Sequence, residues 1–183
     1  MAVGEAIKEA REARGMTQDA VGEIGFISNK MVSAVERGTR LASADVLKRM
    51  VTALDYHRLY MEASAEITGG VYASPWLDGD GVDLHRASVW AKTTQEMKEA
   101  LEALSVTCVI NCPSVADEQS RQQVRESLIQ AIDVRVAVDH YVGIICEEYG
   151  FSLLDVYREH RRKLESRGYV KPKKKSTAAT ALI

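Results

Sequence analysis

Apolar residues recur every three or four positions along most of the chain, which is the spacing of helices that bury one side. Over residues 1–65 the pattern predicts five short helices, the last of them around residues 56–63. A small polar residue precedes three of these helices and would cap its N-terminus, because a side-chain oxygen there can accept a free backbone N–H. The predicted caps are Thr17, Ser28 and Ser43.

The rest of the chain has longer periodic segments. Residues 84–104 carry an apolar stripe made of Trp90, Met97, Leu101 and Leu104. The longest segment covers residues 117–149, and a last helix covers residues 152–167. Residues 106–112 are β-branched and fit either a short buried strand or an irregular helix end. We therefore expect an all-α protein, with a five-helix N-terminal domain and a C-terminal helical domain that contains one long helix.

Composition and charge divide the chain further. Residues 66–83 are the one stretch rich in Gly and Pro, and we interpret them as a linker. We expect residues 84–168 to form a dimerisation or effector domain and residues 169–183 a basic, disordered tail. Residues 1–65 carry nine basic and nine acidic side chains, whereas residues 66–157 carry six basic and fifteen acidic ones. An acidic middle therefore follows an N-terminal part with no net charge.

Two of the predicted helices fill residues 17–38 and are separated by a tight turn. In the second of these helices Val32 and Val35 share one side, and polar residues three or four positions apart share the other. The polar set is Asn29, Lys30, Ser33 and Arg37. This layout is typical of a helix-turn-helix, in which the second helix enters the major groove of DNA.

The same stretch closely resembles the lambda-repressor/Cro (Xre-type) family of bacterial and phage regulators. The family pattern begins Thr-Gln, has an apolar residue at the fifth position and an apolar-Ser pair before the reading helix, and ends Glu-Arg-Gly or Glu-Asn-Gly. The matching residues here are Thr17, Gln18, Val21, Ile27, Ser28, Glu36, Arg37 and Gly38. The resemblance covers about the N-terminal third of the chain and implies a lambda-repressor-like DNA-binding domain at residues 1–65.

The resemblance also implies which side chains contact DNA. Its base-reading places correspond to Asn29, Lys30 and Ser33. An asparagine can pair with adenine N6 and N7, and a lysine can reach guanine O6 and N7. The position of Gln18 at the start of the first of the two helices lets its amide and the free backbone N–H groups hold a phosphate. Arg37, Thr39 and Arg40 lie just past the reading helix and would contact the sugar-phosphate backbone. The alternative for such a polar set is an ordinary solvated helix face.

Two positions stand out from this pattern. The family usually has a glycine in the turn, where this chain has Phe26, with Gly25 one place earlier. The geometry of the turn is therefore the point at which this chain departs from the family. Glu36 is expected to pair with an arginine inside the domain rather than to contact DNA.

A second copy of the chain is the partner that we expect beside DNA. From Leu128 to Ile145 apolar residues cover most of the circumference of the long helix, so it must be buried on more than one side. The candidate dimerisation residues are Leu128, Ile132, Val138, Val142 and Ile145. The alternative is a helix at the centre of a monomeric bundle. A dimer would also compensate an uncharged DNA reader, because non-specific affinity comes mainly from neutralised phosphates.

The basic C-terminal end has two interpretations. Residues 158–183 carry nine basic and two acidic side chains, and Lys171 begins a lysine-rich run. The run either keeps the protein in solution or adds contacts with phosphate groups. Contacts of the second kind would steepen the salt dependence of DNA binding.

No catalytic, cofactor or metal site is expected. The chain lacks a Gly-rich phosphate loop, an H-E-x-x-H motif and a nucleophile elbow. The acidic run between Asp78 and Asp83 lacks the glycine and glutamate that an EF-hand requires. Cys108 and Cys112 have poor spacing for zinc and are expected to be buried thiols. An odd number of cysteines and the absence of long apolar runs favour a cytoplasmic protein without a membrane span.

The sequence thus favours a sequence-specific transcription regulator, most simply a repressor of a phage or other mobile element. It would bind a pseudo-palindromic operator as a homodimer, with half-sites one helical turn apart. An alternative is a protein-binding adaptor, such as an antitoxin or antirepressor, that acts through the acidic C-terminal domain. A small-molecule sensor with a pocket in that domain is a third, less favoured hypothesis.

Overall fold

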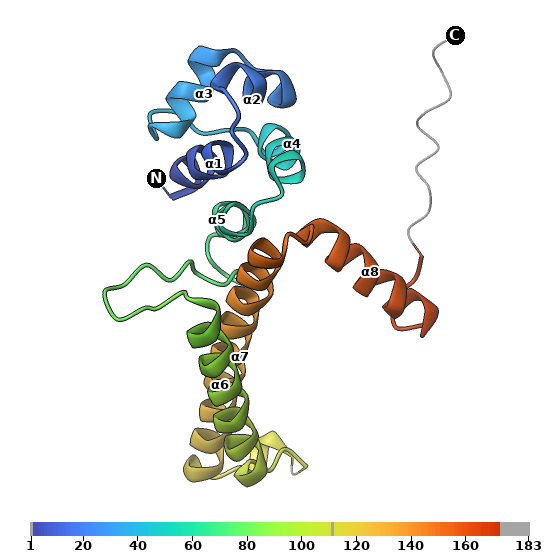
Figure 1. The fold of residues 1–183 in the computed structure, drawn as a ribbon. Coiled ribbons are helices and arrows are strands. Elements are labelled where there is room, and N and C mark those ends of the chain that lie inside the picture. Colours follow the sequence, from blue (N-terminus) through green and yellow to red (C-terminus); the bar gives the residue numbers. More distant parts are fainter. Residues whose placement is uncertain (1, 111, 173–183) are drawn as a thin grey trace. The chain divides into compact units, whose positions relative to one another are not determined.

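A computed structural model describes residues 2–110 and 112–172, and these residues form eight α-helices, one short 3-10 helix and no strand (Figure 1). The predicted all-α fold is confirmed. The helices of the N-terminal part are α1 (Ala2–Ala13), α2 (Gln18–Gly25), α3 (Asn29–Glu36), α4 (Ala44–Leu54) and α5 (His57–Thr68). They are followed by α6 (Arg86–Val106), η1 (Pro113–Val115), α7 (Glu118–Tyr149) and α8 (Leu153–Ser166).

The first five helices enclose one apolar core. Its largest fully buried side chains include Ile7, Met50, Leu54 and Leu59, which come from α1, α4 and α5. The three predicted caps form as the sequence indicates: the hydroxyls of Thr17, Ser28 and Ser43 accept the backbone N–H groups of Ala20, Met31 and Val46. The core fixes how α2 and α3 are presented, because both helices pack against it through buried valines.

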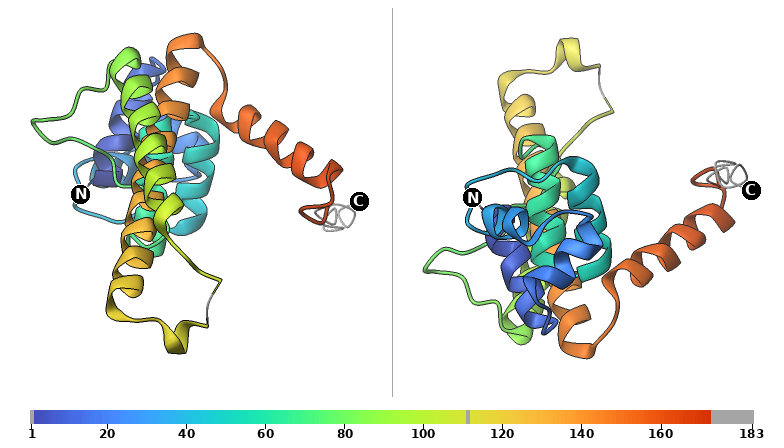
Figure 2. Two further views of the ribbon diagram at one scale, coloured as in Figure 1. Left: turned by 90° about the horizontal axis from the view of Figure 1, so that it is seen from below. Right: turned by 90° about the horizontal axis from the view of Figure 1, so that it is seen from above.

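Helices α6 and α7 lie side by side along most of their lengths (Figures 1 and 2). Side-chain hydroxyls join the two backbones: Thr93 Oγ1 donates to the carbonyl of Ala137 at 3.1 Å, and Thr107 Oγ1 donates to that of Gln123 at 3.3 Å. The residues that α6 buries are Val89, Thr93, Glu96 and Ala100. The predicted stripe of Trp90, Met97, Leu101 and Leu104 is instead exposed, by between 45% and 67%. We call this antiparallel pair of helices the hairpin.

The connection between α6 and α7 differs from what the sequence indicates. Helix α6 ends at Val106, and residues 107–110 form neither a strand nor a continuation of the helix. Cys108 and Cys112 are exposed, so the expectation that they are buried is wrong. The physical reason is their place at the turn of the hairpin, where the neighbouring Val109 and Ile110 are also exposed. A hydrogen bond with Ser114 lowers the pKa of the Cys112 thiol.

The third cysteine behaves as a core residue. Cys146 lies in α7 and is buried, and this burial raises the pKa of its thiol.

The segment between α5 and α6 is partly packed on α7. Ser74 is buried and donates a hydrogen bond of 2.5 Å to Oδ2 of Asp139. The backbone N–H of Leu77 donates to Nε2 of His140 at 3.2 Å. The ring of Trp76 lies between those of His57 and His140, with centroids 4.9 Å and 5.3 Å away. This segment therefore holds α5 close to α7.

Gly143 in α7 allows α5 to approach α7 closely. A Cβ atom added at Gly143 would lie 2.7 Å from the Cβ of His57, a distance that real Cβ contacts do not reach. The imidazole of His57 is buried at this contact, with its Nδ1 3.1 Å from Oε2 of Glu147. We call the contact among α5, residues 74–77 and α7 the junction.

The chain separates into two compact units, with residues 1–153 in the first and residues 154–183 in the second. Within the second unit α8 is held by its own ion pairs, Arg158 with Asp155 at 3.0 Å and Arg161 with Glu165 at 2.9 Å. Most of the predicted basic tail, from residue 173 to residue 183, lies outside the described residues.

Candidate nucleic-acid interface

Helices α2 and α3 meet at a turn that leaves little room for side chains. A Cβ atom added at Gly22 would lie 2.7 Å from the carbonyl oxygen of Ile27, so the small residue in the middle of α2 is required by the return of the chain. The N–H of Ile27 donates to the carbonyl of Gly22 at 2.9 Å and closes the turn. Ser28 then starts α3 with its side-chain cap.

Phe26 adopts a left-handed backbone conformation, which glycine takes more readily than any other residue. Its φ and ψ are 53° and 43°, and its N–H donates to the carbonyls of Gly22 and Glu23. A residue with a Cβ atom therefore occupies a left-handed position at the end of α2. The left-handed region costs a residue with a Cβ about 1–2 kcal/mol.

The side chain of Phe26 recovers part of this energy. The ring is 82% exposed, and the guanidinium carbon of Arg49 lies 5.2 Å from its centroid. Arg49 also donates from Nη2 to the carbonyl of Gly25 at 2.9 Å. One cation of α4 thus holds both the ring and the backbone of the turn.

Helix α3 presents the predicted reading residues on its outer face. Val32 and Val35 are buried in the core, whereas Asn29 and Lys30 are exposed and Ser33 is partly exposed. Helix periodicity places position 33 one turn above positions 29 and 30 on the same side. The structure therefore brings the three predicted base-reading residues together on one surface.

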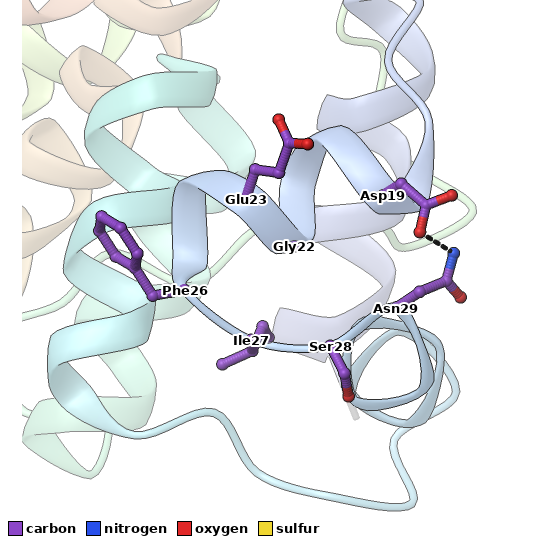
Figure 3. Close-up of a pocket in the computed structure, with 7 residues that line it drawn as sticks. All are labelled: Asp19, Gly22, Glu23, Phe26, Ile27, Ser28 and Asn29. Carbon is purple, nitrogen blue, oxygen red and sulfur yellow. Dashed lines mark hydrogen bonds between the residues drawn. The ribbon is translucent and has the colours of Figure 1, made fainter.

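Asn29 is tied to α2 by a contact that the sequence analysis did not include. Its Nδ2 donates a hydrogen bond of 2.7 Å to Oδ1 of Asp19. Figure 3 shows this pair at one end of a shallow hollow between the two helices, with Phe26 at the other end. A signal for the pair exists in the sequence only as an acidic residue in the first turn of α2, which also fits a role in stabilising the helix dipole.

The predicted internal pairing of Glu36 is confirmed. Nε of Arg11 lies 2.7 Å from Oε1 of Glu36, whose side chain is only 4% exposed. The hydrogen bond to Glu36 raises the pKa of Arg11 above its ordinary value. Gln18 completes the cluster, because its Nε2 donates to Oε2 of Glu36 at 2.7 Å. The amide of Gln18 is thus oriented at the start of α2, with its Oε1 and a second N–H left over.

The predicted backbone-contacting residues beyond α3 have different surroundings. Arg37 and Arg40 are exposed, and Nε of Arg37 donates to the carbonyl of Ser33 at 3.2 Å. The hydroxyl of Thr39 donates to the carbonyl of Ala34 at 3.0 Å and so helps to end the helix. The guanidinium groups therefore keep donors for phosphate oxygens, while the hydroxyl of Thr39 retains only its acceptor capacity.

Across residues 2–110 and 112–172, no group of three or more His, Cys, Asp and Glu side chains is placed to hold a metal ion. Across this part of the chain no helix combines the length and apolarity needed to cross a membrane.

A tight two-helix turn on a five-helix core, with amide and cationic side chains outermost on the second helix, defines the DNA-binding helix-turn-helix class. Comparison with known families agrees: a family model described as helix-turn-helix matches residues 7–61. This part of the chain is a helix-turn-helix domain of the Xre/lambda-repressor type, the domain of DNA-binding transcription regulators. No curated protein and no solved structure gave a match to the chain.

Proposed function

We propose that this chain is a sequence-specific transcription regulator that binds double-stranded DNA as a homodimer, most simply a repressor from a phage or other mobile element. The observation that carries the proposal is the outer face of α3, where Asn29 and Lys30 are exposed within a domain that the helix-turn-helix family model matches. The buried valines of α3 hold this face in place from behind.

The chemistry of the three reading residues fits the major groove. Asn29 can pair with adenine through N6 and N7, and Lys30 can donate to guanine O6 and N7. Ser33 is short and reaches either a base edge or the sugar-phosphate backbone. Gln18, Arg37, Thr39 and Arg40 supply the surrounding backbone contacts.

Charge and exposed apolar surface both support the proposed homodimer. The N-terminal 65 residues have equal numbers of basic and acidic side chains, so one copy gains little from phosphate neutralisation. Two copies on a pseudo-palindrome double the specific contacts. Of the candidate dimerisation residues, Leu128 and Ile132 are each 60% exposed, and Val138, Val142 and Ile145 are partly exposed.

Selection of bound fragments from a random DNA pool tests this proposal. The full chain should enrich a sequence with two-fold symmetry, and the N29A/K30A variant should retain that sequence at least about 100-fold less well, because two base contacts are lost. A Q122A/R125A variant is the matched control, since it removes one exposed amide and one exposed cation from α7. Equal loss in both variants, or no enriched sequence at all, would refute the proposal.

A protein-binding adaptor is the second candidate. The observation in its favour is the apolar surface of the hairpin, which any partner with a complementary face would cover. It predicts that a different protein, rather than DNA, is retained by the N29A/K30A variant as well as by the wild type.

A further inference from the structure

The exposed stripe of α6 has the spacing of a coiled coil. Trp90, Met97, Leu101 and Leu104 are separated by seven, four and three residues. Thr94 fills the one gap, so that the series alternates four and three residues over four steps. Side chains with this repeat form a single seam that another helix can cover. None of the five carries a charge.

The side of α6 that packs against α7 carries few large apolar side chains, so the hairpin gains little hydrophobic stabilisation from it. Val89 is the one large apolar residue that α6 buries; the others are Thr93, Ala100 and Glu96. The side chain of Glu96 is only 10% exposed and pairs with Lys92. Large apolar side chains would gain more from this position, since burial is favourable in proportion to apolar area. Their location on the adjacent exposed side indicates that something else covers them.

The apolar surface continues from α6 onto α7. Arg86, Ala87 and Trp90 of α6 line one groove together with four apolar or aromatic residues of the α7 side: Tyr141, Ile145, Tyr149 and Phe151. Along α7, Val138 and Val134 precede Tyr141 at steps of three and four residues, so they extend the same side of that helix. We call the resulting surface the apolar face: Trp90, Met97, Leu101 and Leu104 of α6 with Val134, Val138, Tyr141 and Ile145 of α7.

We propose that the apolar face is covered by the same face of a second copy, so that two hairpins pack as a four-helix bundle. This inference rests on the proposed homodimer and revises its surface. Val138 and Ile145 remain in it, the α6 half is added, and three of the candidates from the sequence lie outside the apolar face: Leu128, Ile132 and Val142. A two-fold axis places each stripe against an identical one, and an uncharged seam with a regular repeat is complementary to itself.

The size of the face agrees with a dimer. At their exposed fractions the four side chains of α6 alone leave roughly 400 Å² of apolar surface open. The α7 half and the rim bring this toward the 800 Å² or so that each partner buries in a stable interface. A free monomer of this size seldom leaves so continuous a patch uncovered.

Sedimentation of the full chain tests the proposal. The wild type should sediment with twice the mass of the chain at micromolar concentration. The M97E/L101E variant should sediment as a monomer, with a dissociation constant raised at least about 100-fold, because two charges would be buried in the seam. A Q119E/Q122E variant adds the same charge at exposed positions of α7 outside the apolar face and should remain a dimer.

A second measurement does not depend on charged variants. In a W76F background Trp90 is the only tryptophan, and it is 60% exposed in a single copy. Its fluorescence should therefore shift to longer wavelength as the protein is diluted and the copies separate. A monomeric wild type, or an M97E/L101E variant that stays dimeric, would overturn the assignment. A monomer that captures a different protein through this face would overturn it in favour of the adaptor.

DNA binding separates this inference from the function on which it rests. The M97E/L101E monomer should keep the base preference of the wild type on DNA that carries one half of the selected site, with weaker retention. A chain that dimerises through the apolar face and enriches no DNA would refute the proposed function while leaving the interface in place.

Discussion

Asn29 donates a hydrogen bond of 2.7 Å from its Nδ2 to Oδ1 of Asp19, so the first residue of the reading helix is held by the first turn of α2. This bond fixes the amide and uses one of its two N–H groups. The Oδ1 and the second N–H remain, and these are the groups with which an asparagine pairs adenine. If this surface binds DNA as proposed, the carboxylate of Asp19 would face phosphate groups and lower the affinity for any DNA sequence.

Two variants of Asp19 should separate its effect on the orientation of the Asn29 amide from the effect of its negative charge on DNA affinity. The D19N variant keeps an acceptor for Asn29 and removes the charge, so it should bind selected and random DNA more tightly while keeping the wild-type base preference. The D19A variant removes both, and its preference for adenine at the contacted position should fall by about 1 kcal/mol or more. Binding assays at several salt concentrations measure both effects. Identical base preferences in the two variants would show that Asp19 does not orient the amide.

Replacing Phe26 with glycine and with alanine should change the free energy of unfolding in opposite directions. The F26G variant relieves the left-handed strain of about 1–2 kcal/mol and loses the contact with Arg49, worth about 0.5–1 kcal/mol, for a net gain of up to about 1.5 kcal/mol. The F26A variant keeps the strain and loses the contact, so its free energy of unfolding should fall by about 0.5–1 kcal/mol. Urea denaturation at one protein concentration distinguishes the two. A loss of stability in F26G would show that the exposed ring packs more strongly than its surroundings indicate.

Removing the carboxylate of Glu36 should be among the most destabilising changes in the domain. The E36A variant leaves the guanidinium of Arg11, 13% exposed, without its main partner and should lower the free energy of unfolding by about 3 kcal/mol. Glu12 contacts the same arginine at 3.3 Å and is 56% exposed, so E12A should cost less than about 0.5 kcal/mol. Similar losses in both variants would mean that the pair contributes no more than surface attraction.

The junction should make stability depend on pH through His140. Its Nδ1 lies 2.9 Å from the carbonyl of Val136 and its Nε2 accepts the N–H of Leu77, so the ring is neutral with the proton on Nδ1. Burial lowers the pKa of His140 below its ordinary value of 6.5. The unfolded chain then binds the proton more readily, and the free energy of unfolding should fall as the pH drops below about 6.5.

Urea denaturation between pH 5 and pH 8 checks this dependence, with slope no greater than about 1.4 kcal/mol per pH unit from one histidine. The H140Q variant is the control, because its amide does not titrate and can still accept the N–H of Leu77. The difference in slope between wild type and variant isolates His140 from the other histidines. Equal slopes would show that the ring is not held neutral by the fold.

The sequence was sufficient for the N-terminal domain because its signals are local. Caps such as Ser28 and the buried spacing of Val32 and Val35 act within one or two turns of helix, and they specify α3 without reference to the rest of the chain. The pairing of Glu36 with an arginine was also predictable, since a carboxylate on the core side of a helix needs a cation. The bond between Asn29 and Asp19 was not, because it depends on how two helices meet across the turn and on side-chain rotamers.

The hairpin shows the limit of periodicity. The stripe beginning at Trp90 was visible in the sequence, but periodicity does not say what covers a stripe. Within the hairpin the small Ala100 and the hydroxyl of Thr93 allow close packing of the helices, and the large side chains remain outside. The prediction for Cys108 and Cys112 was wrong for a related reason: their apolar neighbours suggested burial, whereas both thiols lie exposed at the turn of the hairpin.

The close approach at Gly143 has a consequence for how an operator is measured. Because α5 packs directly on α7, the α3 helices of the proposed dimer would be connected rigidly to the hairpins rather than through flexible linkers. With such a rigid connection, the dimer should bind only operators whose half-sites have one separation and one rotational phase. Inserting a single base pair between them would move one half-site by about 3.4 Å and turn it by about 35°. The protein should not bind an operator with that spacing, whereas a dimer with flexibly linked DNA-binding domains would bind it.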